Sequence, residues 1–163
     1  MRSPAEPQAA TPPESPSARP SGAPLSFEIV RHFDAAPQRV FDAWLSEQWA
    51  EWLAPGDFTG KLLLLEPRVG GRYRIEMRRP NGSTTHISGR YLEISRPRRL
   101  VLTWVGAHSP EETVLTLSFD GDGIGTRLTL QHVGFCSAEL RDRHHLGWSS
   151  PTGALSHLEN LLK

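Results

Sequence analysis

The last segment of this chain is its only long helical element, and this limits the folds that the chain can adopt. Residues 137–163 carry leucines at helical spacing, namely Leu155, Leu158, Leu161 and Leu162. The preceding part, from residue 27 to residue 132, shows mostly strand and turn patterns. We therefore expect the last segment to cover a curved antiparallel sheet, with a ligand-binding hollow between the two.

An interruption is expected inside this helix. Gly147 lowers helix propensity, and Pro151 removes a backbone hydrogen bond unless it begins a helix. Ser150 and Pro151 together resemble an N-cap followed by a first helical residue. The sequence therefore predicts a kink or a restart here.

The strands are predicted from alternation of apolar and polar residues. We expect six or seven of them, at residues 25–33, 61–66, 72–79, 83–94, 100–105, 112–120 and 126–132. Pro80, Asn81 and Gly82 predict a hairpin turn. Two short helices are expected after the first strand, one beginning at Pro37 and one at residues 47–53.

The N-terminal residues form a separate segment. Residues 1–24 contain seven of the fourteen prolines, with Ala, Ser and Glu among the rest. Such a composition predicts a disordered tail ahead of a domain at residues 25–163. A proline-rich docking ligand is the alternative.

The composition limits the cellular setting and the partners. The net charge is zero, so no overall charge favours nucleic acid or an anionic membrane. The single cysteine, Cys136, excludes an internal disulfide and fits a reducing compartment. Without an apolar run of spanning length or a secretory signal, we expect a cytoplasmic protein with no membrane insertion. The predominance of arginine over lysine suggests GC-rich coding sequence, and we expect a bacterial protein.

Eight short motifs, in this order, resemble the helix-grip superfamily of START-like lipid-transfer domains (SRPBCC), in its branch resembling activators of the heat-shock-protein-ninety ATPase. The motifs lie at Ala36–Trp44, Trp52–Pro55, Val69–Tyr73, Asn81–Gly82, Gly89–Ile94, Pro97–Trp104, Thr126–Phe135 and Gly147–Trp148. The resemblance covers residues 27–162. It implies an α+β helix-grip fold: a curved antiparallel sheet of six to seven strands around a long C-terminal helix.

The expected ligand-binding residues are those that face the hollow of such a fold. They are Trp44, Trp52, Tyr73, Met77, Ile87, Tyr91, Trp104, Leu115, Leu117, His132, Phe135 and Trp148. As a set they are more often a plain core than a cofactor site, so the expectation of a hollow depends on the fold. The tryptophans that follow the first strand either line the pocket or fill one end of the core.

His132 is the polar member of that set. The alternation in residues 126–132 directs it into the apolar interior. It is either a buried imidazole satisfied by the protein or a polar anchor that orients a ligand.

Other chemistries lack the residues they need. His144 and His145 are adjacent on a helix and cannot chelate one metal ion together. The glycines at residues 121–125 precede a strand, so they offer no helix N-terminus to a phosphate. Most arginines of two clusters alternate outward and mix with glutamates, which favours a solvated face over a nucleic-acid platform. The clusters are Arg72, Arg74, Arg78 and Arg79, and Arg96, Arg98 and Arg99. We expect no metal and no cofactor.

Three functions therefore stand as hypotheses. The first is non-catalytic binding of a small hydrophobic or amphipathic molecule, with micromolar affinity. The second is a polyketide cyclase/aromatase-like enzyme that uses the same cavity, as in relatives of the superfamily, with His132 and Tyr73 or Tyr91 as its acid–base groups. The third is a protein-interaction module, for which a chaperone is implied by the family name alone. A homodimer is left open.

Overall fold

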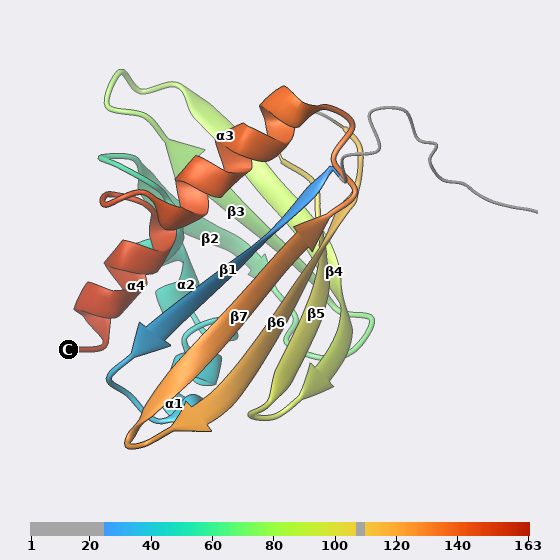
Figure 1. The fold of residues 1–163 in the computed structure, drawn as a ribbon. Coiled ribbons are helices and arrows are strands. Elements are labelled where there is room, and N and C mark those ends of the chain that lie inside the picture. Colours follow the sequence, from blue (N-terminus) through green and yellow to red (C-terminus); the bar gives the residue numbers. More distant parts are fainter. Residues whose placement is uncertain (1–24, 107–109) are drawn as a thin grey trace, which may run out of the picture.

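The computed structural model describes residues 25–106 and 110–163. These residues form seven strands and four helices (Figure 1). The strands are β1 (Ser26–Phe33), β2 (Thr59–Leu65), β3 (Arg72–Arg78), β4 (Thr84–Ser95), β5 (Arg99–Trp104), β6 (Thr113–Asp122) and β7 (Gly125–Val133). The helices are α1 (Pro37–Asp42), α2 (Gln48–Leu53), α3 (Ala138–Ser149) and α4 (Ala154–Leu161). The tail predicted at residues 1–24 lies outside the described residues.

All strands join one antiparallel sheet in the order β1-β7-β6-β5-β4-β3-β2. The hairpin between β3 and β4 turns at Gly82, whose φ of 89° is one that glycine adopts without strain. Asn81 stabilises this turn by accepting a hydrogen bond from the backbone N–H of Ser83. The predicted helix-grip fold is confirmed.

The sheet bends sharply at β4. Residues up to Arg90 pair with β3, whereas β5 pairs from Tyr91 onward, with a bulge between Tyr91 and Glu93. Gly89 lies at the bend, and a Cβ there would stand 2.0 Å from the carbonyl oxygen of Thr103. The bend thus depends on a residue without a side chain, and it makes one face of the sheet concave.

The helices pack on this concave face (Figure 1). Ser137 begins α3 as its N-cap, because its hydroxyl accepts a hydrogen bond from the N–H of Leu140. Trp148, near the end of α3, packs against Trp104 of β5 and against Trp44, with ring centroids 5.2 and 5.7 Å apart. The last helical segment therefore crosses the sheet as expected.

The predicted interruption of this segment is present, but its second half begins later than expected. The N–H of Ser150 still bonds to the carbonyl of Leu146, so Ser150 is the C-cap of α3. The N-cap of α4 is Gly153, and Pro151 lies in the turn between the helices. Helix α4 therefore starts at Ala154, three residues after the predicted position.

Candidate functional site

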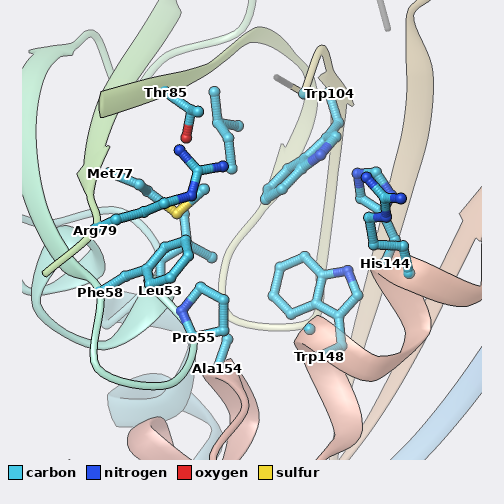
Figure 2. A pocket seen from close by; sticks show the side chains of 14 residues that line it. Leu53, Pro55, Phe58, Met77, Arg79, Thr85, Trp104, His144, Trp148 and Ala154 are labelled. Atoms are coloured by element: carbon cyan, nitrogen blue, oxygen red, sulfur yellow. The ribbon is translucent and has the colours of Figure 1, made fainter. Parts of the chain in front are cut away.

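A cavity of about 270 Å³ lies between α3 and the bent part of the sheet (Figure 2). Met77, Thr85 and Ile87 line it from the inner faces of β3 and β4. Trp104 lines it from the end of β5, and Trp148 from α3. The remaining lining residues are Leu53, Pro55, Phe58, Arg79, Gly106, Arg143, His144, Gly147 and Ala154.

The inner wall of the cavity is apolar and buried. Leu53, Ile87, Trp104, Trp148 and Ala154 are each at most 4% exposed. Two indoles and aliphatic side chains form this surface. When an apolar molecule covers it, water is released, and the free energy of the system falls. This wall can therefore bind an apolar group without a specific polar contact.

The outer rim is cationic. The side chain of Arg143 is 50% exposed, and Arg79 is half-buried. Figure 2 shows Arg79 and Thr85 on the side formed by β3 and β4, opposite His144 and Trp148. The cavity thus changes from apolar inside to charged at its rim.

Beside the cavity, His132 is held in a chain of hydrogen bonds with one consistent direction. The indole N–H of Trp148 donates to Nδ1 of His132 over 3.3 Å. His132 Nε2 must then carry the proton, and it donates to Thr113 Oγ1 over 2.8 Å. Thr113 in turn donates to the carbonyl oxygen of Trp104 over 3.0 Å. This chain ties α3 to β5, β6 and β7 and requires a neutral imidazole.

Burial keeps His132 in that neutral state. The residue is fully buried, and desolvation, aided by the nearby His144, holds its pKa well below the ordinary value. The two imidazole centroids are 5.5 Å apart. Of the two interpretations of His132, the buried imidazole satisfied by the protein agrees with these contacts.

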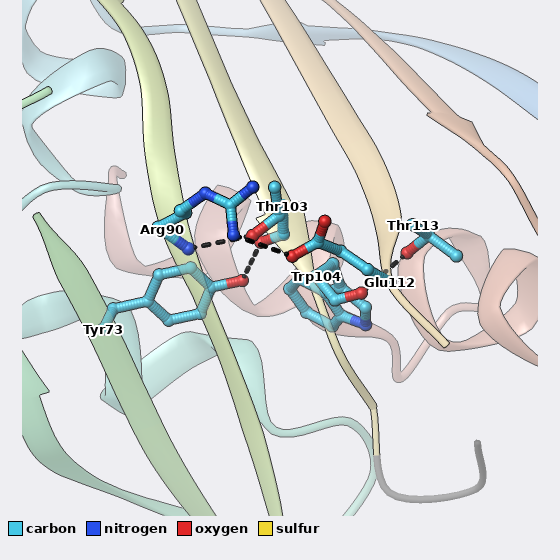
Figure 3. Close-up of polar contacts among 6 residues, drawn as sticks. All are labelled: Tyr73, Arg90, Thr103, Trp104, Glu112 and Thr113. Carbon is cyan, nitrogen blue, oxygen red and sulfur yellow. Dashed lines mark hydrogen bonds and ion pairs between the residues drawn. The ribbon is translucent and has the colours of Figure 1, made fainter. Parts of the chain in front are cut away.

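The hydroxyl of Tyr73 is a second buried polar group, and it links strands β3 and β5 (Figure 3). Tyr73 on β3 donates its hydroxyl proton to the carbonyl oxygen of Thr103 on β5 over 2.7 Å, which spans the bend in β4. Burial, and then Tyr91 and Glu112, raise the pKa of Tyr73 well above its ordinary value. Burial also raises the pKa of Tyr91, whose hydroxyl has no hydrogen-bond partner among the residues that the structure describes. Both tyrosines therefore remain protonated at neutral pH.

The structure brings four of the twelve predicted residues to the cavity, namely Met77, Ile87, Trp104 and Trp148. Phe135 borders a separate void of only about 10 Å³, which Trp104 also lines. The remaining seven are buried in the core and do not line the larger cavity: Trp44, Trp52, Tyr73, Tyr91, Leu115, Leu117 and His132.

Ten of the fourteen lining residues were not predicted, and the sequence carried a signal for some of them. Arg79 lies two residues after Met77 and so continues the inward side of β3. His144 and Gly147 precede Trp148 by four residues and by one, which places them around the same part of α3. Leu53, Pro55 and Phe58 lie where the chain leaves α2, and of the three only Pro55 is a fixed residue of a motif, the one at Trp52–Pro55.

The structure also separates the adjacent histidines. His144 Nδ1 donates to the carbonyl of Leu140, and its ring faces Trp104 and His132. His145 packs instead on Phe27 of β1, with ring centroids 5.0 Å apart.

Residues 25–106 and 110–163 contain no group of three or more His, Cys, Asp or Glu side chains that could hold a metal ion. Within the same ranges, no helix has the length and apolar character needed to cross a membrane.

The fold and the cavity together define a helix-grip domain with a small internal pocket. Comparison with protein families gives the particular family: residues 34–162 match the model described as "Activator of Hsp90 ATPase homolog 1-like protein", and the chain belongs to this family, within the SRPBCC superfamily. The fold of this family is a ligand-binding fold. No curated protein matches the chain.

Solved structures share the fold of this chain. A protein from Chromobacterium violaceum is 28% identical with a TM-score of 0.77, and the match covers 85% of this chain and 96% of that one. A protein from Rhodobacter sphaeroides is 26% identical with a TM-score of 0.73, covering 84% and 91%. The AHSA1 protein from Silicibacter pomeroyi is 24% identical with a TM-score of 0.71, covering 84% and 96%, and shares the fold.

Proposed function

We propose that this protein binds a small apolar or amphipathic molecule in the cavity between α3 and the sheet, without catalysing a reaction on it. The observation that carries the proposal is the buried apolar wall formed by Leu53, Ile87, Trp104 and Trp148. Membership of a family with a ligand-binding type of fold supports it.

The cavity volume sets the size of the ligand. A cavity of roughly 150 Å³ holds one benzene molecule, so a cavity of this size accommodates about ten non-hydrogen atoms. Burial of that many atoms supports dissociation constants on the order of 100 µM, once the cost of association is included.

The acid–base groups named for the enzyme hypothesis lie outside this cavity. Tyr73 bonds to the Thr103 carbonyl, and both ring nitrogens of His132 have partners within the protein. Neither residue lines the space where the ligand would bind. This arrangement favours binding over the cyclase/aromatase alternative.

Calorimetric titration with 1-octanol, a neutral probe of suitable size, tests the proposal. The blocking variant is Gly147→Leu, because a Cβ at Gly147 meets no atom within 4 Å and Gly147 lines the cavity. The matched control is Leu146→Ala, since Leu146 is 63% exposed on the same helix and does not line the cavity. Binding to the wild type and to Leu146→Ala, with loss in a folded Gly147→Leu variant, is expected. Equal binding by all three, or none by the wild type, would contradict the proposal.

A further inference from the structure

The cationic rim indicates the chemistry of the ligand's polar end. We propose that the cavity selects a single-chain amphiphile with an anionic head group, specifically a free medium-chain carboxylate, whose chain lies against the buried wall and whose carboxylate lies between Arg79 and Arg143. This inference rests on the proposed function and specifies the ligand class for the same site.

Arg79 is the first reason. Its guanidinium stacks over the ring of Phe58, another lining residue, at 5.3 Å from the centroid, and Nη1 donates to Ser83 Oγ over 3.3 Å. These contacts hold the cation in place. Among the described residues no carboxylate forms an ion pair with it. A positioned cation beside an apolar cavity is suited to an anion that arrives with an apolar chain.

Arg143 supplies a second cation from α3. Its one ion pair among the described residues is with Glu139, one helical turn earlier, at 3.4 Å. That pair joins side chains that are 50% and 83% exposed, so water screens it strongly. A guanidinium has five N–H donors, and this contact leaves others available to a ligand at the rim.

The charged residues that line the cavity are all cationic, although the net charge of the chain is zero. The fourteen lining residues include two arginines, with no aspartate or glutamate. A carboxylate at the rim would therefore meet guanidinium groups from both walls, whereas an ammonium group would be repelled. A neutral head group would gain little from either arginine.

The test compares octanoate, 1-octanol and octylammonium by calorimetry on the full chain at about pH 7.5. Arg79→Gln and Arg143→Gln are made singly and together. Arg74→Gln is the matched control, because Arg74 lies exposed on β3 and does not line the cavity. Circular dichroism confirms that each variant is folded.

We expect wild-type protein to bind octanoate more tightly than octylammonium. The double variant should lose about tenfold in octanoate affinity, while 1-octanol binding changes less than about twofold. The octanoate affinity alone should fall when salt rises from about 50 mM to about 500 mM. Arg74→Gln should behave as the wild type.

Two results would overturn the inference. One of them leaves the proposed function intact, and the other contradicts it as well. If 1-octanol binds but octanoate affinity is the same in the wild type and in the double variant, the anionic selectivity is wrong and the apolar pocket remains. If the wild type binds neither 1-octanol nor octanoate, the inference and the proposed function both fail.

Discussion

The indole N–H of Trp148 and Nδ1 of His132 are joined by a buried hydrogen bond of 3.3 Å, which links α3 to β7 beside the cavity. Trp148→Phe removes the donor and leaves a buried imidazole nitrogen without a partner, at a cost of about 1–3 kcal/mol beyond the lost volume. Urea unfolding at about pH 7.5 measures this cost.

Trp44→Phe is its matched control. Trp44 is also fully buried, but its indole N–H has no hydrogen-bond partner among residues 25–106 and 110–163, so this variant loses the same volume and no hydrogen bond seen there. We expect Trp148→Phe to be the less stable variant by at least about 1 kcal/mol. An equal or larger loss in Trp44→Phe would show that the bond to His132 contributes nothing.

The same histidine predicts a dependence of stability on pH. Its pKa is lowered in the folded protein, so below about pH 6.5 the unfolded chain binds a proton that the folded chain does not. Stability must therefore fall as the pH falls through that value, by at most about 1.4 kcal/mol per pH unit from this group. Above about pH 6.5 the contribution is constant, because His132 is then neutral in both states.

The measurement is the free energy of unfolding at about pH 7.5 and about pH 5.5, for the wild type and for His132→Gln. A glutamine side chain cannot titrate, so the variant should lose less stability than the wild type between the two values. Equal losses would mean that His132 is not the group responsible.

The two buried tyrosines give a further pair of variants. Tyr73→Phe removes the hydrogen bond to the Thr103 carbonyl across the bend and should cost about 1 kcal/mol. Tyr91→Phe removes a buried hydroxyl that has no partner in the described part of the chain, and should be neutral or stabilising. Thermal unfolding of both variants checks this order, and a more harmful Tyr91→Phe would contradict it.

Much of the fold follows from alternation of residue types, because each strand has one buried face. The alternation in β3 and β7 placed Tyr73 and His132 inward, and both are at most 1% exposed. The boundary of the cavity could not be predicted in this way. Alternation says which side chains point inward, but it does not say which of them line the cavity, as Ile87 does, and which are covered by other side chains, as Leu115 is.

The first residue of α4 could not be predicted from the local sequence either. Ser150 and Pro151 have the local pattern of a helix start, yet α3 continues until Ser150 caps it. The carbonyl of Ser150 then accepts a hydrogen bond from Ser156, and that of Thr152 accepts one from the N–H of Gly56. Contacts beyond the local sequence therefore fix the turn, and no local pattern includes them.

Alanine substitutions at Gly89 and Gly147 test whether the bend in β4 requires glycine. Gly89 lies at that bend, and Gly147 lies in α3. Gly89→Ala would place a methyl group 2.0 Å from a backbone oxygen, so the variant should lose several kcal/mol or fail to fold. Gly147→Ala meets no atom within 4 Å in the interior of α3 and should gain about 0.5–1 kcal/mol. Chemical denaturation compares them, and a tolerated Gly89→Ala would show that the bend does not require glycine.

The most direct test of the binding site is the position of the probe in solution. Intermolecular nuclear Overhauser effects between 1-octanol and the labelled protein should connect the octyl chain to the methyl groups of Met77 and Ile87 and to the indole protons of Trp148, which line the cavity. Effects confined to residues exposed on the convex face of the sheet, such as Val30, would contradict an apolar binding site beneath α3.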